Sequence, residues 1–356
     1  MNRRFNMRAA CAVVAAGAVI AATPAAISAP SRAVADGLDG PRGVALGPGG
    51  TLAVAEASGV VSTVVRKGPN RGDTVRIGRV PRTYIAPAID TNSKGQVFAL
   101  TAGDSVEGAA TLYRFTPGHG RRKMADIAKY QRRDPDPYDL EGRPRTSNPF
   151  GVAGLNNGGA LVADAEGNEL LRVRPNGKIN TVARVKPRTV ESPDLGPGGP
   201  PPGTAMPAEA VITSVTVGAD GSYYIGELRG FPATPGTSQI WRIKPGSKNA
   251  VCNPVKPRRG DCKRFADGLT SVVDLGAGRD GSIYAVELSK QSWLAMEGGG
   301  AGSEIGSLIR ISPDRKVRRE LAKDQLVMPG GVEVGRGGRV FVTTPVFGQG
   351  RLLRVR

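Results

Sequence analysis

The chain is poor in the residues on which many hydrolytic and metal-dependent enzymes rely. Its 356 residues include a single histidine, His119, and three cysteines. His119 stands in a Pro-Gly-His-Gly stretch, which is typical of a solvent-exposed hairpin turn. A nucleophile activated by histidine is therefore not expected, and neither is a metal site built from histidine and cysteine.

Aromatic residues are also scarce, at 5% of the chain, and no segment after the N-terminus shows the 3.6-residue apolar period of a long helix. We therefore expect almost no helix. The formal net charge is +18, but basic residues are not interleaved with stacking aromatics, so we expect no nucleic-acid partner. The positive charge favours solubility and attraction to anionic wall polymers, lipid headgroups or acidic ligands.

What the chain has instead is a unit repeated six times. Each copy contains an apolar strand, a tight turn with glycine, a second apolar strand that ends in an acid or threonine, a loop, and a third strand with the pattern apolar-apolar-Arg. Repeats of this length built from short strands are typical of propellers and arrays. The turn glycines are Gly50, Gly95, Gly158, Gly221, Gly281 and Gly338.

A candidate fourth strand follows most of the arginine strands, and four antiparallel strands make a propeller blade. The last unit ends on its third strand, so we expect residues 32–36 to supply the missing one and close the ring, which removes two exposed sheet edges. The sequence thus predicts an all-β, six-bladed β-propeller of four-stranded antiparallel blades over residues 29–356. The predicted blades span about 37–80, 81–130, 147–185, 209–267, 268–322, and 327–356 together with 32–36.

Residues 1–28 have the pattern of a signal peptide. Arg3, Arg4 and Arg8 precede an apolar run over residues 11–22, and small residues suited to cleavage follow. The run is too short for a membrane-spanning helix in the mature chain, although an uncleaved anchor is the alternative. We therefore expect a secreted, monomeric protein without a transmembrane anchor.

Two cysteines, Cys252 and Cys262, remain after the predicted cleavage. An even number of cysteines in an exported chain favours a disulfide, and these two flank the loop over residues 253–261 in the fourth unit. Two free thiols are the alternative.

One position at the end of the second strand is acidic in four units and threonine in the other two. In a propeller these ends lie near one face, and the long loops over 134–148, 186–209, 228–238 and 288–307 are expected on that face too. We predict a ligand site at this mouth of the central channel, formed by Glu56, Thr101, Asp164, Glu227, Glu287 and Thr344.

The chemistry of this predicted site stays open between two interpretations. The four carboxylates, Glu56, Asp164, Glu227 and Glu287, could hold a hard cation such as Ca²⁺ or grip a cationic or hydroxylated ligand. Alternatively, the side chains form hydrogen bonds with backbone amides at the ends of the blades. The sequence identifies no catalytic residue.

Several segments resemble the ScyD/ScyE family of exported proteins. They are the run Ser147-Asn148-Pro149-Phe150-Gly151-Val152, the segment Gly226-Glu227-Leu228-Arg229-Gly230-Phe231-Pro232, residues 240–246, and the late run Pro329-Gly330-Gly331-Val332. The resemblance covers about residues 34–356. It implies an NHL-type, TolB-like six-bladed propeller and export. Its namesakes are associated with making the pigment scytonemin, but most members have no established activity, so the resemblance does not imply an enzyme.

We therefore favour an exported binding or scaffold propeller over an enzyme, with a small-molecule, cell-wall or protein ligand at the mouth. The alternative is a metal-dependent, Ca²⁺-type propeller hydrolase or lactonase resembling gluconolactonase or strictosidine-synthase-like enzymes. A third class is an envelope assembly protein that uses its basic surface.

Overall fold

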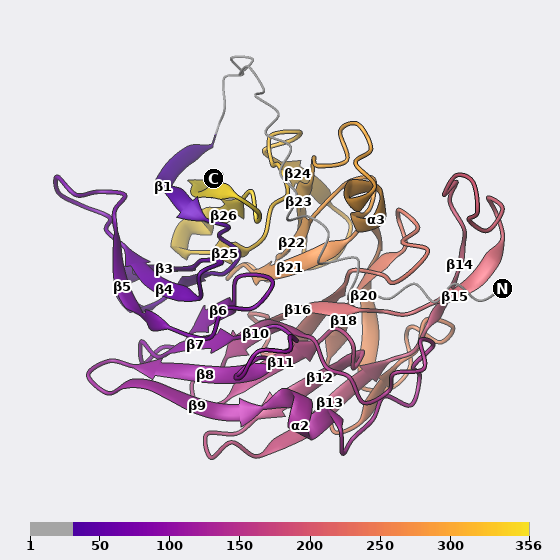
Figure 1. The fold of residues 1–356 in the computed structure, drawn as a ribbon, viewed down its shortest axis with the longest axis horizontal. Coiled ribbons are helices and arrows are strands. Elements are labelled where there is room, and N and C mark those ends of the chain that lie inside the picture. The colour runs from indigo at the N-terminus through magenta and orange to yellow at the C-terminus, as the bar shows by residue number, and fades with distance from the viewer. Residues whose placement is uncertain (1–30, 356) are drawn as a thin grey trace.

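A computed structural model describes residues 31–355, so the predicted signal peptide lies outside the described residues. The chain forms six sheets arranged as blades around a central axis (Figure 1). This arrangement confirms the all-β, six-bladed propeller predicted from the repeats. In the part of the chain that the structure describes, no helix is both long enough and apolar enough to cross a membrane.

In blades one to five the strands follow the chain from the axis outward, and in blade six the outermost strand is instead the first strand of the chain. Blade one contains β2 (Val44–Leu46), β3 (Leu52–Ala55), β4 (Val60–Val64) and β5 (Thr74–Arg79), and blade two contains β6 (Ala88–Thr91), β7 (Val97–Leu100), β8 (Thr111–Thr116) and β9 (Gly120–Asp126). Blade three contains β10 (Pro149–Gly154), β11 (Ala160–Asp164), β12 (Glu169–Val173) and β13 (Ile179–Val185), and blade four contains β16 (Ile212–Val217), β17 (Tyr223–Glu227), β18 (Ser238–Ile243) and β20 (Cys262–Leu269). Blade five contains β21 (Val272–Ala277), β22 (Ile283–Glu287), β23 (Ser307–Ile311) and β24 (Arg318–Leu321), and blade six contains β25 (Val332–Val334), β26 (Val340–Thr344), β27 (Gln349–Arg354) and β1 (Arg32–Asp39).

Strand β1 completes the last blade, as predicted, and it is longer than the expected segment 32–36. It pairs antiparallel with β27, from Arg32 opposite Arg354 to Asp39 opposite Gln349. Figure 1 shows this N-terminal strand beside the C-terminal strand of the chain. The first and last strands of the domain therefore hold the ring together.

The innermost strands pack against one another all the way round the axis. Each innermost strand contacts that of the next blade, in the order β2, β6, β10, β16, β21 and β25, and β25 contacts β2 again. Glycine permits this close approach. A Cβ atom at Gly151 would lie 2.7 Å from the carbonyl oxygen of Thr213 in the next blade, which is closer than a carbon can come without displacing the strand.

The core is divided between neighbouring blades, as expected for a propeller. The largest buried side chain, Trp241, packs between blades three and four with Leu161 and Ile225. Since each blade buries both faces against its neighbours, no blade has a complete core of its own.

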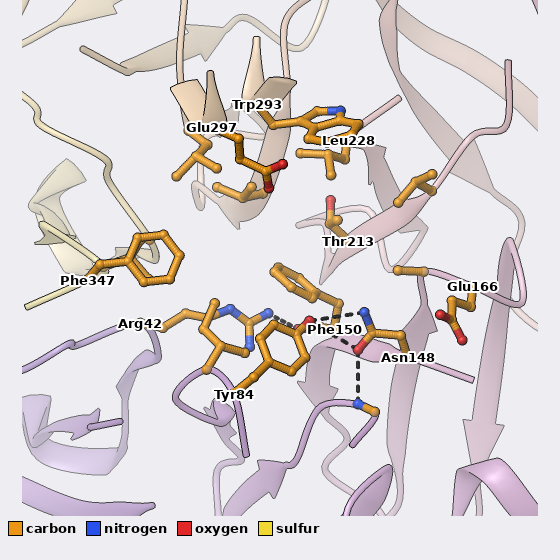
Figure 2. Close-up of a pocket in the computed structure, with 18 of the residues that line it drawn as sticks. Arg42, Tyr84, Asn148, Phe150, Glu166, Thr213, Leu228, Trp293, Glu297 and Phe347 are labelled. Carbon is orange, nitrogen blue, oxygen red and sulfur yellow. Dashed lines mark hydrogen bonds between the residues drawn. The ribbon is translucent and has the colours of Figure 1, made fainter. Parts of the chain in front are cut away.

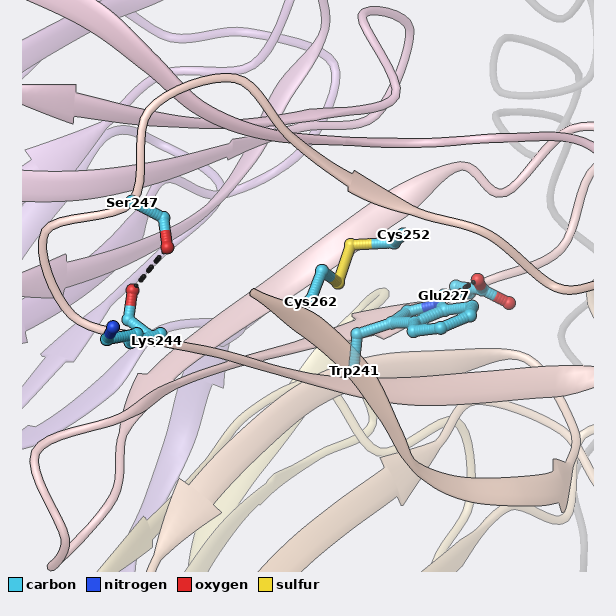
Figure 3. Close-up of a disulfide and its surroundings, with 6 residues drawn as sticks. All are labelled: Glu227, Trp241, Lys244, Ser247, Cys252 and Cys262. Carbon is cyan, nitrogen blue, oxygen red and sulfur yellow. Dashed lines mark hydrogen bonds between the residues drawn. A yellow bond between two sulfur atoms is a disulfide. The ribbon is translucent and has the colours of Figure 1, made fainter. Parts of the chain in front are cut away.

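Cys252 and Cys262 form the predicted disulfide, with their Cα atoms 5.0 Å apart (Figure 3). The structure adds a feature that the sequence did not predict. Cys252 ends a short strand, β19 (Ala250–Cys252), which pairs in parallel with β13 of blade three, whereas Cys262 begins β20 of blade four. The disulfide therefore links the outer edges of two neighbouring blades.

Three small elements interrupt the ring of strands. A hairpin of β14 (Arg188–Glu191) and β15 (Ala205–Ala208) projects between blades three and four (Figure 1). Two short helices, α2 (Ile127–Gln131) and α3 (Trp293–Glu297), were not predicted from the helical period because each has only five residues. Helix α3 belongs to the long loop within blade five and positions part of the candidate site.

Candidate functional site

A cavity of about 290 Å³ lies at the end of the channel where the long loops emerge. Every blade, or the segment leading into it, contributes to its wall (Figure 2). The predicted loops over 134–148, 228–238 and 288–307 supply lining residues, whereas the fourth predicted loop, over 186–209, supplies none. The cavity is thus at the mouth that the loop lengths indicated.

The wall of the cavity is mainly apolar, with four aromatic rings. Leu228, Leu288 and Val346 are among its aliphatic side chains. Its aromatic side chains are Tyr84, Phe150, Trp293 and Phe347. An apolar recess with a small number of polar groups is the usual form of a small-molecule site.

Helix α3 is held over the cavity by specific hydrogen bonds. The Ser292 side chain caps its N-terminus by accepting from the backbone N–H of Ala295, at 3.2 Å. The indole Nε1 of Trp293 donates to the carbonyl oxygen of Arg229, at 2.8 Å. The loop within blade five is thereby fastened to the loop within blade four, and Trp293 and Glu297 are both placed at the cavity.

Asn148 and Tyr84 form a polar pair on another part of the wall. The Asn148 amide donates to the Tyr84 hydroxyl at 3.0 Å, and the Asn148 Oδ1 accepts from the backbone N–H of Gly103 at 2.9 Å (Figure 2). Because these bonds fix both side chains, the pair is available to orient a polar group of a ligand without rearranging.

Arg42 is the most heavily buried charge in the cavity wall, with 5% of its surface exposed. Its guanidinium donates to the carbonyl oxygens of Ala86 and Phe150 and lies 3.7 Å from the centre of the Phe150 ring. Burial lowers the pKa of Arg42 to about 10, so it stays protonated at neutral pH. Arg42 lies before the first repeat unit, and sequence reasoning missed it because no repeated position marked it.

Three carboxylates also line the cavity: Asp104, Glu166 and Glu297. Asp104 accepts from the backbone N–H of Tyr84, at 3.0 Å, and Glu166 lies 4.0 Å from the guanidinium of Arg143. Burial alone raises the pKa of Glu297 to about 7. Glu297 lies in the loop over 288–307, outside the repeated positions, so sequence reasoning missed it as well.

The six side chains predicted to form the site lie at the ends of the second strands, where each forms local hydrogen bonds. Glu56 accepts from the backbone N–H of Asp39, at 2.9 Å. Thr101 donates to the carbonyl oxygen of Gly108, at 2.8 Å, and Thr344 donates to that of Val327.

The other three predicted carboxylates are more deeply buried. Asp164 accepts from Ser147 and from the backbone N–H of Asn148, at 2.8 Å. Burial raises its pKa to about 6. The carboxylate of Glu227 accepts from the indole of Trp241, at 2.6 Å, and pairs with Arg229; Glu287 accepts from Ser307 and from the backbone N–H of Thr270. Burial also raises the pKa of Glu227 and that of Glu287.

None of the six is among the residues that line the cavity, but their neighbours are. Ala165, Leu228 and Leu288, each one residue after a predicted acid, do line it. Nor does the structure bring the four carboxylates together. Within residues 31–355, no group of three His, Cys, Asp or Glu side chains is placed to hold a metal ion.

Two further acids join the innermost strands of neighbouring blades. Asp90 of blade two accepts from the backbone N–H of Gly154 in blade three, at 2.7 Å, and Asp274 of blade five accepts from that of Val332 in blade six, at 2.8 Å. Burial raises the pKa of Asp90 to about 7 and that of Asp274 to about 6.

These raised pKa values give a testable pH dependence of stability. Buried acids such as Asp90, Asp164 and Asp274 bind more protons in the folded than in the unfolded chain between about pH 4 and pH 7, so the free energy of unfolding falls as the pH rises through this window. The melting temperature should therefore be higher near pH 5 than near pH 7.5, at constant ionic strength. Asp90→Asn should flatten this slope, and a melting temperature that rises over the same window would contradict the assignment.

The comparisons with known proteins agree with the fold. No family model matches this chain, and no curated protein matches its sequence. Solved structures similar to it include a glucose dehydrogenase, with 16% identity and a TM-score of 0.57 over 92% of this chain and 98% of that one. A second is a streptogramin B lyase, with 15% identity and a TM-score of 0.51 over 92% of this chain and 97% of that one. A third is a PQQ-bound aldose sugar dehydrogenase from Streptomyces coelicolor, with 17% identity and a TM-score of 0.52 over 91% of this chain and 97% of that one. Similarity at this level of identity establishes the shared fold and nothing about activity.

Proposed function

We propose that this chain is an exported, six-bladed β-propeller of the ScyD/ScyE type that binds a small, largely apolar molecule in the cavity at the loop-bearing end of its channel. The observation that carries the proposal is the cavity itself, which is built from all six blades and walled by aromatic and aliphatic side chains. The pattern of residues 1–28 and the Cys252–Cys262 disulfide support export, because disulfides persist in oxidising compartments.

The size of the cavity restricts the ligand. A volume of about 290 Å³ is at the lower end of the range for small-molecule sites, so a compact molecule of one to three rings fits better than a polymer chain. The fixed Asn148–Tyr84 pair offers hydrogen bonds to one polar group, and the aromatic rings offer apolar contact to the rest.

The hydrogen bonds of the predicted acids favour binding over the hydrolase alternative. A Ca²⁺-type lactonase needs oxygen ligands that converge on one point. Asp164, Glu227 and Glu287 are instead each engaged in hydrogen bonds at the end of a separate blade. The solved neighbours named as a lyase or a dehydrogenase share the fold at less than 20% identity, so they do not favour a particular reaction.

The proposal can be tested with the neutral aromatic probe N-phenylnaphthylamine, whose fluorescence increases in apolar surroundings. We expect the wild-type protein to enhance the fluorescence at a saturable site. Leu288→Trp should abolish this enhancement, because Leu288 lines the cavity and a larger side chain there would leave too little room for the probe.

Val255→Trp is the matched control, since Val255 is 85% exposed and lies outside the cavity wall. It introduces the same side chain and should leave the enhancement unchanged. Both variants should melt as the wild type does within a few degrees. Equal enhancement by wild type and Leu288→Trp, or no saturable enhancement at all, would show that the cavity does not bind apolar molecules.

A further inference from the structure

We propose that the molecule bound in this cavity is an organic cation, in which a protonated amine or quaternary ammonium group is joined to an aromatic or other apolar body and lies beside Glu297. This inference rests on the proposed function and adds the chemical class of the ligand to it.

Glu297 is the charged group of the cavity for which the described residues supply no partner. It ends helix α3, is half-buried, and its carboxylate points into the cavity (Figure 2). The other charged side chains of the wall are engaged. Asp104 accepts two backbone N–H groups, Glu166 faces Arg143, and Arg42 donates to two carbonyl oxygens.

Burying part of a carboxylate without a partner disfavours its charged form, and the pKa of Glu297 reflects this. The pKa of Glu297 rises to about 7, and burial is the one cause. A cation bound next to it would restore the interactions that the carboxylate loses when it leaves water. An anion in the same place would add repulsion to that loss.

The charge of the cavity wall is opposite in sign to the net charge of the chain. The protein as a whole is strongly basic, at +18, whereas the cavity wall contains three carboxylates and one arginine. Since Arg42 already has carbonyl acceptors and lies over Phe150, it is satisfied without an anionic ligand. The local excess of negative charge therefore favours a cationic ligand.

Aromatic rings complete a site of this kind. Trp293 lies on the same helix as Glu297, and Tyr84 and Phe347 belong to other parts of the wall. The faces of such rings attract ammonium groups, with about 0.5–2 kcal/mol per interaction, and they also contact the apolar body of the ligand. A carboxylate together with several rings in a recess of about 290 Å³ matches a single-ring amine in size and charge.

The test uses three probes with one phenethyl body and different charges: phenethylamine, phenethyl alcohol and hydrocinnamate. Their affinities for the full mature protein are measured by calorimetry at about pH 8, where both the amine and Glu297 are charged, and at a salt concentration near physiological. We expect the amine to bind about tenfold more tightly than the alcohol, as one charge-assisted hydrogen bond would provide, and hydrocinnamate to bind most weakly.

Glu297→Gln should reduce the affinity for the amine about tenfold and leave that for the alcohol unchanged. Glu304→Gln is the matched control. It removes the same charge from the same loop, but Glu304 does not line the cavity, so the preference for the amine should persist.

The outcomes separate this inference from the proposed function. If the alcohol binds as tightly as the amine, or if Glu297→Gln weakens both equally, the ligand is apolar but not cationic and the inference fails alone. If hydrocinnamate binds best, Arg42 rather than Glu297 selects the ligand, and the inference is overturned. If none of the three probes binds and N-phenylnaphthylamine does not bind either, both the proposed function and this inference fail.

Discussion

A protein that begins at Gly40 instead of residue 31 is expected to lose cooperative folding of the whole ring. The deletion removes β1, whose Ala35 and Leu38 are 2% and 3% exposed and pack in one cluster with Val44 and Phe341. It also removes the backbone pairing with β27 and leaves the edge of that strand open. Because each blade depends on its neighbours for its core, the loss should spread beyond blade six.

The measurement is thermal and urea unfolding of the two proteins, with and without a synthetic peptide of residues 31–39. We expect a broad, early transition for the shortened protein. The peptide should restore the transition by adding the missing strand to the open edge. A peptide with Ala35→Asp and Leu38→Asp is the control and should not restore it. If the shortened protein unfolds with the wild-type midpoint, β1 does not close the ring energetically.

Replacing Arg42 should have the second-largest effect, because this residue joins four blades. Its guanidinium donates to the carbonyl oxygen of Ala86, in the segment that leads into blade two, and to that of Phe150, in β10 of blade three. Its own carbonyl accepts from Thr343 of blade six, at 2.9 Å, and its N–H donates to Ala55 of blade one, at 3.2 Å.

Arg42→Met keeps the backbone bonds and removes the guanidinium. Two buried carbonyls then lose their donor, at about 1–3 kcal/mol each, together with the interaction over the Phe150 ring. Relief from burying a charge offsets part of this loss, so we expect a net destabilisation of about 2–4 kcal/mol in urea unfolding.

Two further variants make the result specific. Arg42→Lys keeps the charge but not the planar fork of donors, so its stability should lie between that of Arg42→Met and wild type. Arg76→Met removes an exposed arginine from β5 and should change the free energy of unfolding little. A wild-type midpoint for Arg42→Met would show that the guanidinium does not hold the blades together.

The sequence by itself determined the architecture, because repeated local patterns were enough to specify it. Glycine turns and alternating apolar strands recur six times, and each copy needs a neighbour on either side to bury its faces. The same local information predicted that residues near 32–36 complete blade six, that Cys252 pairs with Cys262, and which end of the ring carries the long loops. These features depend on order along the chain.

Only the tertiary structure decided which side chains face the cavity. Successive residues of a strand point to opposite sides, so an error of one position exchanges a cavity-facing side chain for one turned toward the blade. Glu227 and Glu287 end β17 and β22 and form hydrogen bonds within their blades, whereas Leu228 and Leu288, the next residues along the chain, line the cavity. Glu297 and Arg42 lie outside the repeated positions, in a loop and a lead-in segment, and they meet at one cavity because the ring brings six blades to a common axis.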